Sequence, residues 1–488
     1  MSSSFHLSVL FLSLGIVSCT EMRSSDKKHA KPNIIIILAD DLGWADLSFR
    51  GNPVYETPHI DRLASEGIVF DNFYPSAANC APSRAGILTG MYAPRHHVYL
   101  PQGYVREGNV GNMRWKVPTF GEDSTFQTFK VNINHVDSAF TSLAEMLGKA
   151  GYISARLGKW HIGDDNQGFT YNSSGGILGE YFNQLGTEGR LYNDTTVAER
   201  LTDTAIELIE KHRDELFFIY LSHWEVHTPM AAKTDRINYY KRKIDSLDVR
   251  EFNAVYAAEV EQLDRSVGRV ASKLEELGLS ENTLVIFISD NGGLMGQTTN
   301  KPLRAGKGTF YEGGIRVPGI MKWPAVIAPG KVSSTTVSGV DLMPTLAEIA
   351  LTSLPTHQPV DGVSITPLFI GKAIEKRSIF FHYPLYLEGR GEDQVLPIFD
   401  TNIPNWRAVP STTVIRGNWK LIKYYEYDSH ELFDLGSDLS EINDVSSVYP
   451  GVTDELLLEI EEWVASTQAP VPSIPNPKFT KSEHFGSR

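Results

Sequence analysis

Three long apolar runs constrain the fold of this chain more than any other feature of its sequence. They are rich in isoleucine and other bulky apolar residues, and they lie at residues 33–39, 216–221 and 283–289. Runs without polar alternation are typical of strands that are buried on both faces of a parallel sheet. Segments with the apolar spacing of helices accompany them, at residues 143–150, 197–213 and 252–277. This alternation predicts an α/β domain whose mostly parallel central sheet is flanked by helices.

The pattern changes near residue 376. The turn Arg416-Gly417-Asn418-Trp419 lies between two short apolar runs and predicts a β-hairpin. The elements expected here are the two hairpin strands, a third short strand and a helix, at residues 412–415, 420–424, 431–434 and 456–464. We therefore expect an α/β domain at residues 33–375 and a small C-terminal α+β subdomain with an antiparallel sheet at residues 376–488. Residues 385–410 are expected to be mostly loop.

The N-terminus has the features of an export signal. Residues 7–17 form an apolar run that is too short to span a bilayer. The run ends in Ile16-Val17-Ser18-Cys19, which resembles the lipobox of bacterial lipoproteins, in which the thiol of the cysteine becomes lipidated. An ordinary secretory signal cut nearby is the alternative. We expect a signal peptide at residues 1–18 and a tether at 19–32, so that the exported protein lies in the periplasm or at the cell surface, anchored to a membrane through Cys19.

Charge and cysteine content narrow the functions further. The formal net charge is −14, so the chain lacks the basic footprint of a nucleic-acid-binding protein. A polyanionic substrate would need a local basic pocket on such a surface. There are two cysteines, Cys19 and Cys80. If Cys19 is lipidated or removed, Cys80 is a single free thiol in an exported protein, which is either inert and buried or functional.

Polar residues directly follow two of the apolar runs. Asp40 and Asp41 come after the first run, and Asp290 and Asn291 come after the third. Ligands of open α/β sheets bind outside the carboxyl ends of the strands. Adjacent buried carboxylates repel each other, and a bound cation relieves that repulsion. Oxygen ligands suit a hard ion such as Ca²⁺ or Mg²⁺, although an Asp pair can also cap a helix.

Further candidates surround these acids in the sequence. Residues His223, Glu225 and His227 follow the second run, and Lys159 and His161 follow a short apolar segment at 152–157. Three cations, Arg304, Lys307 and Arg316, lie in the glycine-rich stretch 302–318. Clustered cations suit an anionic substrate group. The alternative is that they form structural ion pairs, and we expect this for Arg316 with Glu312.

One stretch is far more specific than the others. Cys80-Ala81-Pro82-Ser83-Arg84, followed by Leu88-Thr89-Gly90, resembles the sulfatase signature, and further segments resemble motifs of that family in the family's order. These segments are Ala39-Asp40-Asp41-Leu42-Gly43, Gly158-Lys159-Trp160-His161, Val226-His227-Thr228-Pro229, Ser289-Asp290-Asn291-Gly292, Gly306-Lys307-Gly308-Thr309 and Glu431-Leu432-Phe433-Asp434-Leu435. The resemblance covers residues 33 to about 445 and implies the alkaline-phosphatase-like fold of formylglycine-dependent sulfatases.

The resemblance also implies a mechanism. Cys80 would be oxidised to formylglycine by a formylglycine-generating or anaerobic sulfatase-maturating enzyme, and its hydrate would attack the sulfate sulfur. One Ca²⁺ ion would be held by Asp40, Asp41, Asp290, Asn291 and residue 80. The ion would neutralise the sulfate oxygens together with Arg84, Lys159 and Lys307. His161 would assist breakdown of the intermediate, and His227 with Lys307 would give a proton to the leaving oxygen.

The expected substrate is a sulfated carbohydrate, such as ulvan, carrageenan, fucoidan or a glycosaminoglycan. One alternative is a phosphomonoester or phosphonate ester hydrolase of the same superfamily. Another is a non-catalytic surface lipoprotein that binds sulfated glycans. Specificity residues are expected in segments 95–140, 164–195 and 385–410. The individual candidates in and around these segments are His96, His97, Trp406 and Arg407.

Overall fold

The computed structural model describes most of the chain. The described residues are 1, 31–100, 107–117, 131–133, 135–163, 166–172, 196–389 and 406–480. Apart from Met1, the expected signal peptide lies outside these ranges, as do Cys19 and nearly all of the expected tether. Residues 31–488 belong to one structural unit.

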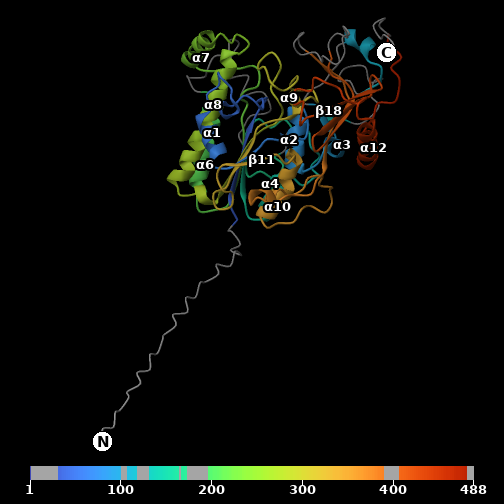
Figure 1. Cartoon of the computed structure of the whole chain (residues 1–488). Helices are drawn as coiled ribbons and strands as arrows, with labels where there is room; N and C mark the ends of the chain where they lie inside the picture. The colour runs from blue at the N-terminus through green and yellow to red at the C-terminus, as the bar shows by residue number, and fades with distance from the viewer. Residues whose placement is uncertain are drawn as a thin grey trace. The chain divides into compact units, whose positions relative to one another are not determined.

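An eight-stranded sheet forms the centre of this unit (Figure 1). Its order is β11-β2-β10-β9-β1-β8-β6-β7. The bounds are β1 Asn33–Ala39, β2 Ile68–Phe70, β6 Ile153–Gly158, β7 Tyr171–Asn172, β8 Phe217–Ser222, β9 Thr283–Ser289, β10 Gly319–Lys322 and β11 Lys331–Ser333. Strand β1 pairs in parallel with β8 and β9, and β6 pairs in parallel with β8, whereas β10 is antiparallel to β9 and β2. The prediction of a mostly parallel central sheet is confirmed, and the three apolar runs form adjacent strands.

Helices cover both faces of this sheet (Figure 1). Along β1, Ile34 and Ile36 join one apolar cluster while Ile35 and Ile37 join the other, because successive side chains of a strand point to opposite faces. One cluster contains side chains of α2 Cys80–Thr89, α4 Leu143–Lys149 and α10 Leu342–Ile349. The opposite cluster contains side chains of α1 Pro58–Ser65, α6 Val197–Lys211, α7 Thr234–Leu247 and α8 Ala254–Glu276. A strand buried on both sides must be apolar throughout, as β1 is.

Helix starts follow capping chemistry that is visible in the sequence. Ser142 and Glu145 form a capping box at the start of α4, and Thr196 and Glu199 do so at α6. The Asn253 side chain accepts hydrogen bonds from backbone amides at the start of α8. The three expected helical segments therefore correspond to α4, α6 and α8. Helix α7 was not anticipated, and it buries fully only Tyr240 and Ile244.

A second sheet lies in the C-terminal part of the chain. Its order is β13-β16-β17-β18, all antiparallel, with bounds Ser378–Tyr383, Ser411–Arg416, Trp419–Tyr424 and Ser429–Asp434. Helix α12, Pro450–Thr467, packs against it, and the ring of Trp463 stacks on that of Phe380 at 4.8 Å. The expected hairpin, third strand and late helix are confirmed. The exact boundary at residue 376 stays a prediction, since one apolar cluster joins Tyr311 of the first part to Phe381 of the second.

The segment 385–410, expected as loop, contains two short strands. β14 Leu387–Glu388 pairs with β15 Trp406–Ala408, and residues 390–405 between them lie outside the described ranges. The remaining elements are short: η1 Ser48–Arg50, β3 Phe73–Tyr74, α3 Ala93–His96, β4 Val98–Leu100, η2 Glu107–Asn112, β5 Asn132–Ile133, η5 Ser280–Asn282, α9 Glu312–Ile315, β12 Val337–Ser338, η6 Gly339–Asp341 and α11 Thr366–Phe369. Two-residue strands of this kind carry little sequence signal, because a period of two cannot be detected over two positions.

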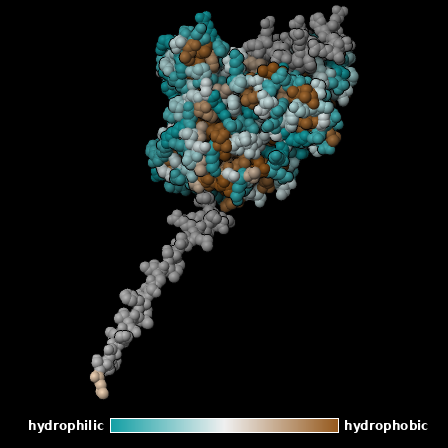
Figure 2. Space-filling model, in the orientation of Figure 1, coloured by the Kyte–Doolittle hydropathy of each residue, from teal (hydrophilic) through white to brown (hydrophobic). Residues whose placement is uncertain are grey.

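Hydrophilic residues cover most of the face seen in Figure 2, with apolar residues interspersed among them. Val332 and Leu351 are examples of exposed apolar side chains, at 66% and 61% exposure. Across the part of the chain that the structure describes, we find no helix with the length and apolar character needed to cross a bilayer.

Candidate active site

The acidic residues expected at two strand ends come together. Ala39 of β1 pairs with Ser289 of β9, so the residues that follow these strands emerge side by side. Carboxylate oxygens of Asp40, Asp41 and Asp290 lie within 4.8 Å of one another. All three residues are buried. Three buried carboxylates this close together repel one another strongly unless positive charge is placed among them.

The loop that carries Asp41 is held by a set of hydrogen bonds. The backbone N–H of Asp41 donates to Oδ1 of Asp290 at 3.3 Å, and that of Leu42 donates to Oγ of Ser289 at 3.0 Å. Asp41 itself has a φ of 63°, so the chain turns sharply at this residue. Asp46 then accepts hydrogen bonds from the Gly43 N–H at 3.1 Å and from the Tyr256 hydroxyl at 2.6 Å. The turn is therefore fixed by groups from β9 and α8.

Two buried oxygens in this group have no hydrogen-bond partner. They are Oδ1 of Asp40 and Oδ1 of Asn291. The amide nitrogen of Asn291 donates to Oδ1 of Asp41 at 2.7 Å, which leaves its oxygen available on the other side. Burial, with repulsion from Asp40, raises the pKa of Asp290 to about 6. Unpartnered buried oxygens beside crowded carboxylates are what a site for a hard divalent cation offers, so these residues fit Ca²⁺.

Cys80 is the first residue of α2 and is buried beside the acids. Its sulfur, a carboxylate oxygen of Asp40 and a ring nitrogen of His227 lie within 4.8 Å of one another. Burial raises the pKa of the Cys80 thiol, so the thiol is neutral at physiological pH. Helix α2 ends at Gly90, whose φ of 70° suits a glycine and whose N–H donates to the Gly86 carbonyl at 2.9 Å. A short, fully buried helix thus presents residue 80 to the acidic group.

Arg84 lies one turn further along α2 and is also fully buried. Its Nε and Nη2 donate to Oδ2 of Asp290 at 2.9 and 2.6 Å. Its Nη1 donates to the carbonyl of Lys159 at 3.0 Å and to the Ser222 hydroxyl. Arg84 therefore ties α2 to the ends of three strands, β9, β6 and β8. The sequence did not single out Ser222, and the signal that could have identified it is its position directly after the apolar run 216–221.

Two lysines complete the charged group. Nζ of Lys159 donates to Oδ2 of Asp40. Nζ of Lys307 lies 2.8 and 2.7 Å from the two carboxylate oxygens of Asp41. Burial alone would raise the pKa of Asp41. Interactions with Lys307, His227 and Lys159 lower it by more, so that the pKa lies well below its usual range. Asp41 therefore stays ionised, and the two lysines are held in place by the carboxylates of Asp40 and Asp41.

Both expected histidines face this charged group. Nε2 of His227 lies 3.8 Å from Oδ2 of Asp41. Burial, then Lys159 and Lys307, lowers the pKa of His227 well below its usual value. Burial, then Lys159 and Arg84, does the same for His161, whose Nδ1 is buried without a partner. Each ring is therefore a neutral imidazole in the absence of a bound anion.

Three other candidates from the sequence lie outside the group. Ring nitrogen Nε2 of His223 lies 2.9 Å from the Ser266 hydroxyl, and this histidine is buried behind the strand ends. Arg304 donates to the Glu441 carbonyl at 2.7 Å. Arg316 forms the ion pair with Glu312 that the sequence predicted, at 2.5 Å. Of the three cations in residues 302–318, only Lys307 reaches the acids.

The four residues expected to contribute to specificity, His96, His97, Trp406 and Arg407, lie in the described part of the chain. His96 is buried, and its Nδ1 accepts a hydrogen bond from the Val98 N–H at 3.1 Å. His97 has a φ of 59° and directly follows α3. Trp406 is buried, and the buried Arg407 lines a small cavity next to Gly308. Much of the three specificity segments lies outside the described ranges, in residues 101–106, 118–130, 134, 164–165, 173–195 and 390–405.

The amino-acid sequence is similar to those of known sulfatases. A family model for sulfatases matches residues 32–352, and a model for the C-terminal part of N-sulphoglucosamine sulphohydrolase matches residues 306–465. A sulfatase of Formosa agariphila is 34% identical over 92% of this chain and 91% of its own length. The N-acetylgalactosamine-6-sulfatase of Mus musculus is 31% identical over 72% of this chain and 68% of its own length.

A solved structure extends the similarity to three dimensions. The crystal structure of Ps i-CgsB in complex with k-i-k-neocarrahexaose superposes with a TM-score of 0.70 at 27% identity, over 91% of this chain and 95% of that one. The buried group of acids, lysines and Cys80 therefore lies within residues that the sulfatase model matches, in a fold similar to that of Ps i-CgsB. This chain belongs to the sulfatase family, a family of sulfuric ester hydrolases.

Proposed function

We propose that this sulfatase removes sulfate from sulfated carbohydrate, with formylglycine made from Cys80 as its nucleophile and one bound Ca²⁺. One observation carries the proposal: Cys80 begins α2 inside a buried group in which oxygens of Asp40 and Asn291 lack partners. A protonated thiol in that position is a weak nucleophile, and a maturating enzyme that converts it to an aldehyde would change its chemistry. The hydrated aldehyde would supply the attacking oxygen. Asp40, Asp41, Asp290, Asn291 and residue 80 would hold Ca²⁺, which would supply positive charge beside the sulfate.

The cations of this chain bind and orient the sulfate group. Lys159 and Lys307 are held by Asp40 and Asp41, so their side chains are ordered before the substrate arrives. Preorganised charges of this kind need no rearrangement as negative charge develops on the sulfate oxygens. Arg84 holds Asp290 in place beside residue 80, where that carboxylate can accept a proton from the nucleophile.

The two histidines move protons. His227 is 3.8 Å from Asp41, and its low pKa is caused partly by Lys159 and Lys307. A bound sulfate ester places negative charge against these two lysines and so raises that pKa. His227, together with Lys307, then gives a proton to the leaving oxygen. His161, a neutral imidazole, accepts a proton when the sulfated intermediate breaks down.

The carbohydrate substrate is supported by similar proteins. The mouse relative is an N-acetylgalactosamine-6-sulfatase, and Ps i-CgsB was crystallised with k-i-k-neocarrahexaose. Sulfated polysaccharides such as carrageenan, ulvan, fucoidan and glycosaminoglycans are therefore the substrate class to test first.

The proposal is tested with protein made in a host that contains a sulfatase-maturating enzyme. The mass of the peptide containing residue 80 should show formylglycine, and sulfate should be released from at least one member of a panel of sulfated oligosaccharides. Cys80→Ala should abolish turnover while the thermal unfolding profile is retained. Activity of Cys80→Ala, or faster hydrolysis of 4-nitrophenyl phosphate than of 4-nitrophenyl sulfate, would contradict the proposal.

A further inference from the structure

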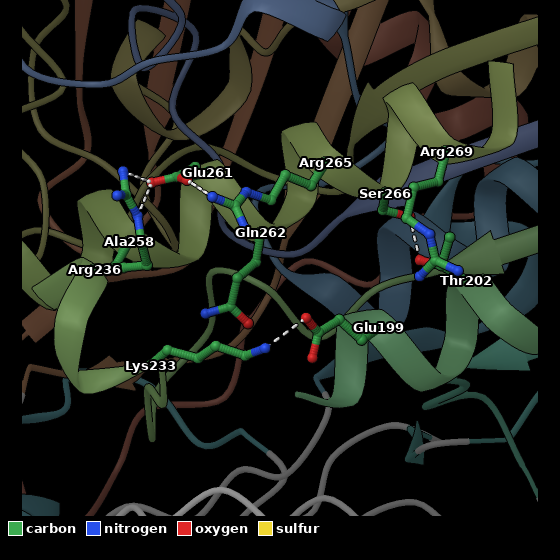
Figure 3. Close-up of a pocket in the computed structure, with 10 residues that line it drawn as sticks. All are labelled: Glu199, Thr202, Lys233, Arg236, Ala258, Glu261, Gln262, Arg265, Ser266 and Arg269. Carbon is green, nitrogen blue, oxygen red and sulfur yellow. Dashed lines mark hydrogen bonds and ion pairs between the residues drawn. The ribbon is translucent and has the colours of Figure 1, made fainter. Parts of the chain in front are cut away.

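A pocket lies among the helices that cover one face of the sheet, and none of the acids of the candidate active site lines it. It has a volume of about 320 Å³ and is bounded by α6, α8 and the residues at the start of α7. Figure 3 shows four cationic side chains around it, Lys233, Arg236, Arg265 and Arg269. Two carboxylates, Glu199 and Glu261, lie among them. The lining therefore carries an excess of positive charge, although the whole chain has a net charge of −14.

All four cations form ion pairs, and the partner of Arg269 is Asp203, which lies outside the lining. Figure 3 shows Glu261 between Arg236 and Arg265, at 2.7 and 2.5 Å. Lys233 pairs with Glu199 at 2.9 Å. The side chains of Arg265 and Lys233 are 54% and 29% exposed. Glu261 is only 10% exposed and stays between its two arginines, whereas Lys233 and Glu199 form a partly exposed pair that contributes little net stability. A sulfate group can therefore take the place of Glu199 beside Lys233 at small cost. Guanidinium groups also bind such oxyanions through two parallel N–H donors.

The pocket has an uncharged polar floor. The Thr202 hydroxyl donates to the Ser266 hydroxyl at 2.6 Å, and the latter lies 2.9 Å from Nε2 of His223 (Figure 3 shows the first contact). His223 directly follows β8, four residues before His227. Buried hydrogen bonds therefore connect these hydroxyls to His223, directly after β8. The same segment of chain continues to His227 of the candidate active site. Hydroxyl groups at the floor and cations at the rim suit a sugar that bears an anionic group.

We propose that this pocket is an accessory binding site for an anionic sugar unit of a polymeric substrate. The inference rests on the proposed function, because it assumes a sulfated chain with several charged units. One unit would occupy the active site while another contacts Arg265 and Arg269, and the second contact would raise the affinity for long chains. Local cations would also attract a polyanion that the rest of the surface repels.

The test compares two variants of equal net charge. Arg265→Gln/Arg269→Gln removes two rim cations that are 54% and 44% exposed. Arg213→Gln/Arg250→Gln removes two cations outside the pocket, 58% and 87% exposed and likewise paired with carboxylates. Dissociation constants are measured by affinity electrophoresis in gels that contain carrageenan, fucoidan or chondroitin sulfate. We expect the pocket variant to bind at least one polymer about tenfold more weakly than wild type, and the control variant to match wild type.

Three further measurements accompany the binding comparison: thermal unfolding, displacement by sodium sulfate and turnover of 4-nitrophenyl sulfate. Thermal unfolding shows that both variants are folded. Equal retention of the pocket variant and the control on every polymer would overturn the proposal. So would sodium sulfate that displaces the polymer at concentrations equal to those of polymer-borne sulfate, because the pocket would then bind the free ion. Turnover of 4-nitrophenyl sulfate by wild type is measured separately; its absence would count against the proposed function and leave the binding comparison valid.

Discussion

Among single residues, Arg84 shows how burial determines what a charged side chain can do. The resemblance to sulfatases placed it among the cations that neutralise sulfate. In the structure its guanidinium is fully buried and donates to Asp290, to the Lys159 carbonyl and to Ser222. A buried guanidinium is tolerated only when most of its donors have partners. Arg84 therefore aligns α2 with three strand ends, and its contact with sulfate stays a prediction.

The first prediction concerns Ser222. Ser222→Ala removes one acceptor of Arg84 and should lower the free energy of unfolding by about 1–2 kcal/mol. It should also lower kcat on 4-nitrophenyl sulfate by about tenfold, since Asp290 loses part of its alignment. Ser411→Ala is the matched control, because Ser411 is a buried serine that donates to the Val409 carbonyl at 3.0 Å. A Ser222→Ala protein with wild-type kcat would show that this contact serves stability alone.

The second prediction concerns calcium. Chelation should lower the unfolding temperature, because the buried carboxylates of Asp40, Asp41 and Asp290 then repel one another. Calcium at a hundred times its dissociation constant should restore about 2.7 kcal/mol of stability. Asn291→Leu removes an oxygen that has no other partner and should weaken calcium binding about tenfold, measured by the calcium dependence of unfolding.

The control for this experiment is another buried asparagine. Asn476 donates hydrogen bonds to the carbonyls of Val110 and Met113, far along the chain from the acids. Asn476→Leu should lose stability and keep the wild-type response to calcium. An unchanged response in Asn291→Leu would remove this residue from the ligand set.

At the scale of elements, helix α2 depends on a close approach that only glycine allows. A Cβ atom on Gly86 would lie 2.0 Å from Oγ of Ser76 and 3.0 Å from the carbonyl oxygen of Met91. By contrast, a Cβ on Gly148 of α4 would meet no atom within 4 Å. The helix that presents Cys80 is thus packed tightly against the loop before it.

These two glycines give a matched prediction. Gly86→Ala should lower the free energy of unfolding by about 1–3 kcal/mol, although alanine favours helices, because Ser76 must move. Gly148→Ala should raise it by up to about 1 kcal/mol, since helix propensity is then the only change. Chemical denaturation measures both. Equal stabilisation by the two substitutions would show that α2 is not packed as closely as the structure indicates.

Elements with a long apolar run or with the apolar spacing of a helix were predictable from the sequence. Elements without either pattern were not. The apolar runs became β1, β8 and β9, and capped amphipathic segments became α4, α6 and α8. Helix α7 was missed because it lies on the surface and buries fully only Tyr240 and Ile244. The pair β14 and β15 was missed because strands of two and three residues are too short to show a pattern in the sequence.

At the scale of the whole molecule, the two cysteines have separate expected fates. Cys80 is buried in the folded unit, whereas Cys19 lies outside the described residues. If the lipobox is processed, Cys19→Ser should prevent incorporation of labelled fatty acid and move the protein from the membrane fraction to the soluble fraction. Cys80→Ser is the control and should keep the label. Equal labelling of both variants would contradict lipid attachment at Cys19.

The sequence by itself determined the chemistry-bearing residues and the type of fold. Apolar runs specify buried parallel strands, and polar residues just after them must gather at one edge of the sheet, since parallel strands end on the same side. Only the tertiary structure decided the partners of Arg84 and Arg304: Arg84 donates to Asp290, the Lys159 carbonyl and Ser222, and Arg304 donates to the Glu441 carbonyl. Long side chains choose partners by distances across the fold, and local sequence patterns carry no information about those distances.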